Sequence, residues 1–174
     1  MPGSGKSTLG EGAAKQTGAT FLDLDGIIVR LAGMTIPEIF AKEGEAGFRA
    51  RETEALRAVA DGGDKTDPIM QGFPYLDSGS NLILATGGGV VTRPENLEIL
   101  RRIGTILYLY RSPETLLETC AREGGRPLLA DPERFQALWE ARKEIYPRWA
   151  DHTVDADGPF QSALDRLIDF LLEL

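Results

Sequence analysis

Short apolar runs alternate along the chain with stretches in which apolar residues recur every three or four positions. The second pattern is typical of amphipathic helices, because residues three and four apart lie on one helix face. A further helix start is indicated by Ser112-Pro113-Glu114, a capping serine followed by proline. Gly18 is expected to end the first helix. The helices predicted by spacing cover residues 8–17, 36–40, 45–60, 94–102, 133–149 and 160–174.

The apolar runs predict buried strands that alternate with these helices. They cover residues 20–25, 81–86, 105–110 and 152–154. Alternating buried strands and helices indicate an α/β fold of three layers, with a parallel sheet covered by helices on both faces. Glycine and proline punctuate residues 61–80, which are therefore interpreted as a long loop or insertion, and residues 123–132, interpreted as a loop.

Composition narrows the classes of protein to consider. The 174 residues fit one domain, and the formal net charge of −8 argues against nonspecific binding to nucleic acid or anionic membranes. No apolar run approaches the roughly 20 residues of a membrane span. A single cysteine, Cys120, cannot form an internal disulfide, which favours a reducing cytoplasm. An anionic ligand must therefore meet a local cluster of basic residues.

A glycine-rich loop opens the first predicted helix. Glycines let backbone N–H groups surround phosphate oxygens, and the helix N-terminus adds its positive dipole end. Lys6 would reach the β- and γ-phosphates, and the Ser7 hydroxyl would bind Mg²⁺. The alternative is a solvated turn that caps a helix. The residues of the loop are Gly3, Ser4, Gly5, Lys6, Ser7 and Thr8.

The complete phosphate-loop pattern has a further glycine, five residues before Gly5, which here would precede Met1. The strand that launches such a loop is likewise not found. We therefore expect a missing upstream segment, and only four strands are readable. The alternatives are a fragment or a shortened chain, or two halves that close up.

Acidic residues and a glycine triplet follow two of the predicted strands. Asp25 would accept a proton from a substrate hydroxyl, and Asp23 would hold magnesium through water. The alternative is that both are solvated strand-end acids or helix caps. The triplet, residues 87–89, would let a ligand approach the backbone, and the alternative is a flexible turn from strand to helix.

With these motifs the chain resembles the shikimate kinase family. The motifs occur in the family's order: PGSGKSTLG at 2–10, FLDLD at 21–25, GFRARE at 47–52, ATGGGVV at 85–91, RPLL at 126–129 and RKEIY at 142–146. The resemblance implies a P-loop NTPase fold whose central first strand is absent here. It also implies transfer of the γ-phosphoryl group of ATP to the 3-hydroxyl of shikimate with Mg²⁺, in aromatic amino acid synthesis. A cytoplasmic monomer is expected.

The resemblance assigns the acceptor site residue by residue. Asp25 would grip the substrate hydroxyls and act as the base, and Arg49 and Arg142 would clamp the substrate carboxylate. Glu52, one turn after Arg49, would orient that arginine. The triplet would pack against the ring through Gly87, Gly88 and Gly89. A planar guanidinium suits this task, because it binds a carboxylate through two charge-assisted hydrogen bonds.

On the nucleotide side, the resemblance implies that Arg126 swings onto the transferring phosphate from a lid at about 122–132. Arg122 would stack on adenine. Without the resemblance, the arginines are interpreted as members of surface ion pairs, which are common and weak. The segment 61–80 is atypical for the family. We expect one domain over residues 1–174, and two alternatives stay open: a kinase for gluconate or another small molecule, and a catalytically silent nucleotide-binding relative.

Overall fold

The computed structural model describes residues 1, 3–62, 81–123 and 131–174, without the side chains of 120–123. Among these residues no helix is both long enough and apolar enough to cross a membrane. The elements are α1 (Lys6–Thr17), β1 (Thr20–Asp23), α2 (Leu24–Ala32), α3 (Ile36–Ala60), β2 (Leu82–Ala85), the 3-10 turn η1 (Val90–Thr92), α4 (Glu95–Ile103), β3 (Leu107–Tyr110), α5 (Pro113–Glu123), α6 (Pro132–Arg142), α7 (Ile145–Trp149), β4 (His152–Asp155) and α8 (Phe160–Leu172).

All four predicted strands are present with boundaries shifted by a few residues, and so are the predicted helices except the one over 133–149. The strand predicted over 20–25 is too long, because Asp23 ends it. The Asp23 side chain accepts a hydrogen bond from the Asp25 backbone N–H at 3.0 Å and so caps α2, a helix that the apolar pattern did not reveal. Most of the predicted insertion at 61–80 and of the predicted lid at 122–132 lies outside the described residues.

The chain divides into two compact units. The first comprises residues 1–13 and 105–174, and the second residues 14–104, so α1 contributes to both. The strands pair two by two, β1 with β2 and β3 with β4, each pair parallel. A single ladder through all four strands is therefore not present in the described residues.

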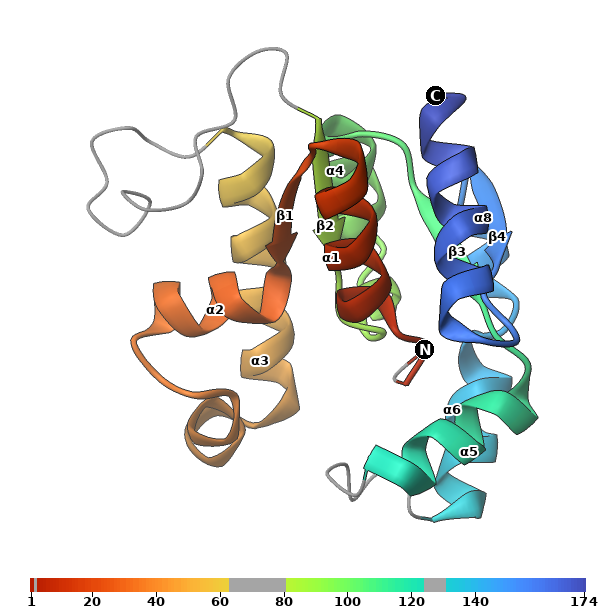
Figure 1. The fold of residues 1–174 in the computed structure, drawn as a ribbon. Helices are drawn as coiled ribbons and strands as arrows, with labels where there is room; N and C mark the ends of the chain where they lie inside the picture. The colour runs from red at the N-terminus through yellow and green to blue at the C-terminus, as the bar shows by residue number, and fades with distance from the viewer. Residues whose placement is uncertain (2, 63–80, 124–130) are drawn as a thin grey trace. The chain divides into compact units, whose positions relative to one another are not determined.

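In the unit of residues 14–104, β1 and β2 run side by side from Thr20 opposite Leu82 to Asp23 opposite Ala85 (Figure 1). Helix α3 packs against α2 and α4. The parallel register brings the carboxyl ends of both strands to one edge, where α2 begins and the glycine triplet follows. The core beneath this edge is apolar and includes Leu24, Ile27, Ile28, Ile39, Ala55 and Leu56.

In the other unit, β3 and β4 pair from Leu107 opposite His152 to Tyr110 opposite Asp155. Helix α8 packs on β4. It also approaches α1 at Gly12, where a Cβ would lie 3.2 Å from a methyl carbon of Leu164. The middle of α1 therefore packs closely against α8.

The helix α3 begins with a capping box and changes direction at a glycine. The Thr35 hydroxyl accepts from the Glu38 N–H, and the Glu38 carboxylate accepts from the Thr35 N–H at 2.7 Å. Gly44 has φ 67° and ψ −171°, which is not helical. The sequence prediction of two helical segments, 36–40 and 45–60, agrees with this kink.

The helix predicted over 133–149 is two helices, α6 and α7, with a break at Lys143 and Glu144. Pro147 explains the break. A proline lacks the N–H that would bond to the carbonyl four residues earlier, and its ring collides with that carbonyl, here that of Lys143. Pro147 is tolerated in the first turn of α7, where no such bond is needed.

Candidate active site

The phosphate loop has the backbone that its glycines predict. Gly3 and Gly5 adopt φ values of 75° and 77°, in the left-handed region that favours glycine. Helix α1 starts immediately afterwards, and the Leu9 N–H donates to the Gly5 carbonyl at 2.8 Å. The loop therefore leads its backbone directly into the positive end of a helix, which is the arrangement that binds phosphate.

Two polar side chains of the loop bond to the backbone at the start of the chain. The Lys6 Nζ donates to the Met1 carbonyl at 2.7 Å and to the Ser4 hydroxyl at 3.1 Å. Ser4 is buried and donates to the same carbonyl at 2.9 Å. Ser7 and Thr8 are exposed in the first turn of α1. The ammonium group and the Ser7 hydroxyl thus come from the same short segment, as phosphate and magnesium binding would require.

A second cation beside the phosphate loop was not predicted from the sequence. Arg111, directly after β3, is only 9% exposed, and its Nε donates to the Ala156 carbonyl at 2.9 Å. A Cβ on Gly5 would lie 3.7 Å from its Nη2. The available signal was its place at the carboxyl end of a strand, where ligands of α/β proteins bind. That Arg111 lies close to Gly5 can be seen only in the folded structure.

On the acceptor side, two carboxylates lie near Gly87, the first residue of the triplet. A Cβ at this glycine would come within 2.8 Å of the Glu52 Oε1 and 3.8 Å of the Asp25 Oδ1. Asp25 lies in the first turn of α2, and Glu52 is completely buried on α3. Both predicted acids therefore face the triplet, and no side chain at position 87 separates them from it.

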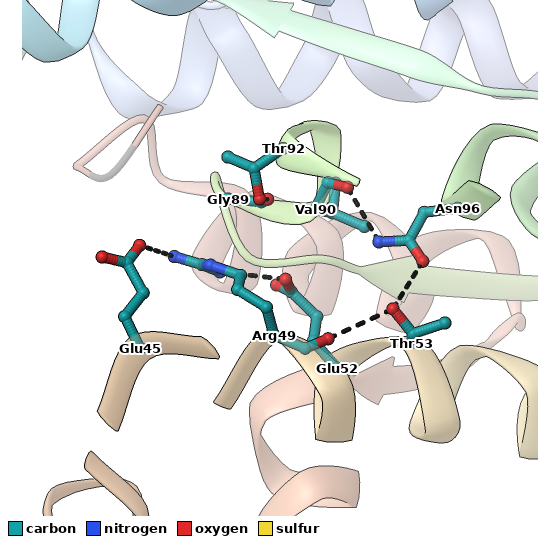
Figure 2. A network of polar contacts seen from close by, with 8 residues as sticks. All are labelled: Glu45, Arg49, Glu52, Thr53, Gly89, Val90, Thr92 and Asn96. Carbon is teal, nitrogen blue, oxygen red and sulfur yellow. Dashed lines mark hydrogen bonds and ion pairs between the residues drawn. The ribbon is translucent and has the colours of Figure 1, made fainter. Parts of the chain in front are cut away.

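The predicted contact between Glu52 and Arg49 is present. The Arg49 Nη1 donates to the Glu52 Oε2 at 2.9 Å, and its Nη2 lies 3.4 Å from the Glu45 Oε1 (Figure 2). Among the described residues, none accepts a hydrogen bond from the buried Arg49 Nε. The Arg49 side chain is only 16% exposed, so its guanidinium is held in place. Its Nε–H can still donate a hydrogen bond.

Gly89 provides the surface on which this guanidinium lies. A Cβ at this position would overlap the Cζ and both Nη atoms of Arg49. Figure 2 shows Arg49 reaching from α3 toward the loop that carries Gly89 and Val90. The triplet is therefore more than a flexible turn, because two of its glycines leave room for charged side chains of α2 and α3.

Two further polar residues of this region were missed. Thr53 on α3 and Asn96 on α4 are 1% and 0% exposed and bond to each other at 2.9 Å. The Asn96 Nδ2 also donates to the Val90 carbonyl at 2.9 Å. Their separation by 43 residues in the sequence left no local pattern that could have joined them.

The remaining predicted residues are placed less completely. Arg142 ends α6 in the unit of residues 1–13 and 105–174, so its pairing with Arg49 stays a prediction. Gly88 lies in the triplet between the two glycines already described. The backbone of Arg122 belongs to α5, but its side chain is not among the described parts of the structure, and Arg126 lies outside the described residues.

Within the described ranges, no group of three or more histidine, cysteine, aspartate or glutamate side chains is arranged to hold a metal ion. Of the two predicted donors, Ser7 lies in the first turn of α1, and Asp23 also serves as the cap of α2.

Comparisons with known families agree on one description. A model of the family described as shikimate kinase matches residues 2–65 and 75–172. The unmatched residues 66–74 fall within the segment interpreted as an insertion. The match covers both the phosphate loop and the acceptor side.

Individual relatives carry the same name. A shikimate kinase of Burkholderia lata is 38% identical over 177 residues, covering 100% of this chain and 87% of the relative. One from Neisseria meningitidis serogroup C is 40% identical over 159 residues, covering 90% of this chain and 84% of the relative.

Solved structures are similar as well. A shikimate kinase from Acinetobacter baumannii in complex with shikimate has a TM-score of 0.78 and 33% identity, covering 98% of this chain and 88% of that one. The shikimate kinase of Aquifex aeolicus has a TM-score of 0.76 and 29% identity, covering 99% of this chain and 92% of that one.

Proposed function

Because this chain belongs to the shikimate kinase family, we propose that it transfers the γ-phosphoryl group of ATP to the 3-hydroxyl of shikimate, releasing ADP and shikimate 3-phosphate. The observation that carries the proposal is the guanidinium of Arg49, seated on Gly89 close to the glycine that Asp25 faces. A fixed guanidinium next to a carboxylate is suited to an acceptor that bears both a carboxylate and hydroxyl groups.

On the acceptor side, Asp25 accepts the proton of the attacking hydroxyl. A carboxylate held in the first turn of α2 approaches a hydroxyl that rests on the triplet at Gly87 and Gly88. Arg49 binds the acceptor carboxylate, with Arg142 as the second cation. Glu52 fixes the plane of the Arg49 guanidinium through its 2.9 Å contact, so the arginine is oriented before the acceptor binds.

On the nucleotide side, the backbone N–H groups from Gly3 to Thr8 surround the phosphates, and Lys6 neutralises the charge that spreads over the transferring group. Arg126 would add a further positive charge to that group, and Arg122 would contact adenine. Ser7, and Asp23 through water, would hold magnesium, which would supply additional charge neutralisation. Positioning and charge neutralisation account for most of the catalysis of phosphoryl transfer.

The reaction class also sets the cellular setting that we propose. The product would enter aromatic amino acid synthesis in the cytoplasm, and the protein would act as a monomer. Its negative net charge of −8 is consistent with recognition of anionic ligands by a local basic site rather than by the whole surface.

Release of ADP from ATP and Mg²⁺, measured with shikimate, with gluconate and without acceptor, tests the proposal. Turnover that depends on shikimate supports it. Turnover that depends on gluconate favours the other small-molecule kinases, and nucleotide binding without turnover favours the silent relative.

Asp25→Asn tests the base. The amide cannot take up the proton, so we expect kcat to fall about a hundredfold or more, while ADP binding, measured by calorimetry, stays unchanged. Near-normal turnover in this variant would show that Asp25 is not the base.

A further inference from the structure

A chain of buried hydrogen bonds joins α3 to the loop that carries the glycine triplet. The Thr53 hydroxyl lies 2.9 Å from the Asn96 Oδ1, and the Asn96 Nδ2 lies 2.9 Å from the Val90 carbonyl (Figure 2). The same hydroxyl lies 3.1 Å from the Arg49 carbonyl. The chain of hydrogen bonds therefore runs from Thr53 on α3, through Asn96 on α4, to the backbone next to Gly89.

The chemistry of the groups fixes the direction of this chain. The Val90 carbonyl only accepts, so the amide of Asn96 must present its NH₂ group there and its oxygen to Thr53. The Thr53 hydroxyl has one proton, and the Asn96 oxygen is the nearer of its two acceptors. A carboxylate in place of the Asn96 amide would set an oxygen against the Val90 carbonyl.

The turn after β2 is closed by bonds of its own. The Gly89 carbonyl accepts from the Thr92 hydroxyl at 2.7 Å and from the Thr92 N–H at 2.9 Å, and the Gly87 carbonyl accepts from the Val90 N–H at 3.2 Å. A displacement at Val90 is therefore passed to both Gly87 and Gly89, the two glycines that face the charged side chains.

From this connection we infer that Thr53 and Asn96 are positioning residues for the acceptor carboxylate. They hold the Gly89–Val90 backbone at the distance from α3 at which the Arg49 guanidinium fits against Gly89. The inference rests on the proposed function, because it assigns the network to the binding of the acceptor through Arg49. Neither residue touches the acceptor itself.

Packing alone does not explain a polar pair at this depth. Two apolar side chains of similar shape fill such a space at nearly equal stability, whereas a buried polar group must find its partner. The pair instead donates a hydrogen bond, through Asn96, to the Val90 carbonyl in the loop that carries the glycine triplet. This bond fixes the position of that loop relative to Arg49.

The test compares Thr53→Val, which keeps the shape and removes the hydroxyl, with Thr53→Ser, which keeps the hydroxyl. In Thr53→Val we expect the KM for shikimate to rise roughly threefold to tenfold, the range for one lost neutral hydrogen bond. The KM for ATP should stay unchanged, and Thr53→Ser should restore most of the affinity. A merely structural role would lower kcat with the folded fraction and leave both KM values alone.

A second variant keeps the inference testable if Thr53→Val folds poorly. Asn96→Asp preserves size and places a carboxylate against the Val90 carbonyl, so its KM for shikimate should rise more than that of Thr53→Val. The matched control is Asn81→Asp, which adds the same charge at an exposed position before β2. An unchanged KM for shikimate in both Thr53→Val and Asn96→Asp would overturn the inference.

Failure of the proposed function is distinguishable from failure of this inference. If the unsubstituted protein does not phosphorylate shikimate, the proposed function fails. The network is then tested by amide hydrogen exchange over residues 87–92 without ligand. Faster exchange in Thr53→Val than in Thr53→Ser supports the link to the loop, and equal exchange overturns it.

Discussion

The guanidinium of Arg49 occupies space that any side chain at position 89 would need. A Cβ there would overlap the Cζ and both Nη atoms, so no small adjustment of one atom relieves the collision. The two ion pairs of Arg49 draw the same group toward α3. Gly89 on one side and the carboxylates of Glu45 and Glu52 on the other thus fix the position of the Arg49 guanidinium.

Gly89→Ala should displace the guanidinium and raise the KM for shikimate about tenfold or more, which corresponds to one lost charge-assisted contact. The KM for ATP should not change. Gly26→Ala is the control, because a Cβ at that exposed helical position meets no atom within 4 Å. Steady-state kinetics of both variants decide the matter, and equal KM values for shikimate would contradict the steric argument.

For single residues, the sequence identifies those whose chemistry matches a short motif. Arg49, Glu52 and the triplet were predicted in this way, and the predicted contact of Glu52 with Arg49 is confirmed. Asn96 and Arg111 were missed because their partners, Thr53 and Ala156, lie 43 and 45 residues away in the sequence. Burial and partner together define such residues, and neither is visible in spacing.

At the scale of the element, the kink of α3 carries its own ion pair. Arg51 contacts the Glu43 carboxylate at 2.6 and 2.8 Å. Eight residues of unbroken helix rise about 12 Å, so the change of direction at Gly44 is what brings these two side chains together. Hydrogen bonding from Arg51 lowers the pKa of the Glu43 carboxyl, so the pair persists to lower pH than an isolated glutamate would allow.

Gly44→Ala should destabilise the protein by about 1–3 kcal/mol, because a Cβ is strained at this φ and ψ. Urea unfolding measures the change. Gly26→Ala, which replaces a glycine of ordinary helical conformation in α2, should instead raise the unfolding free energy by up to about 1 kcal/mol. If both variants change the unfolding free energy by the same amount and sign, the protein does not require the unusual backbone conformation at Gly44.

Periodicity identifies long helices well and the joints between elements poorly. The apolar residues Leu22 and Leu24 fit a strand that continues to Asp25, but the side chain of Asp23 begins a helix instead. Likewise, the apolar pattern of 133–149 continues through the break that Pro147 imposes. In both cases one residue with a specific backbone effect overrides a regular pattern.

At the scale of the whole molecule, the α/β class and the four strands follow from the sequence, and the two-by-two pairing of the strands does not. Apolar runs predict that strands are buried, but the order of strands depends on contacts between distant segments. The division into two compact units is likewise invisible to composition. The prediction of one domain over 1–174 stays a prediction.

Alkaline unfolding gives a global test through Tyr108, which is buried in β3 and stacks on Tyr146 at 5.3 Å between ring centroids. Burial, reinforced by Tyr146 and Tyr110, raises the pKa of Tyr108 to about 12. The unfolded chain loses this proton near pH 10. Between these values the folded state binds more protons, so the unfolding free energy falls as pH rises.

Tyr108→Phe removes this titration. We therefore expect the decline in unfolding free energy from about pH 10 to about pH 12 to be shallower in the variant, while below pH 9 the two proteins have parallel profiles. Urea unfolding across that range measures the difference. Equally steep alkaline profiles would show that the Tyr108 phenol does not retain its proton in the folded protein.

The contact of the Arg49 guanidinium with Gly89 also limits which substitutions this protein can accept. Substitution tables rank glycine to alanine among the mildest exchanges, and at Gly26 that ranking should hold. At position 89 chemical similarity offers no protection, because the first added carbon already collides with Arg49. If position 89 is varied to all amino acids and cells are selected for growth that depends on this enzyme, glycine alone should be retained. Which residues are accepted there is then decided by the space that Arg49 already fills, not by the chemical type of the residue.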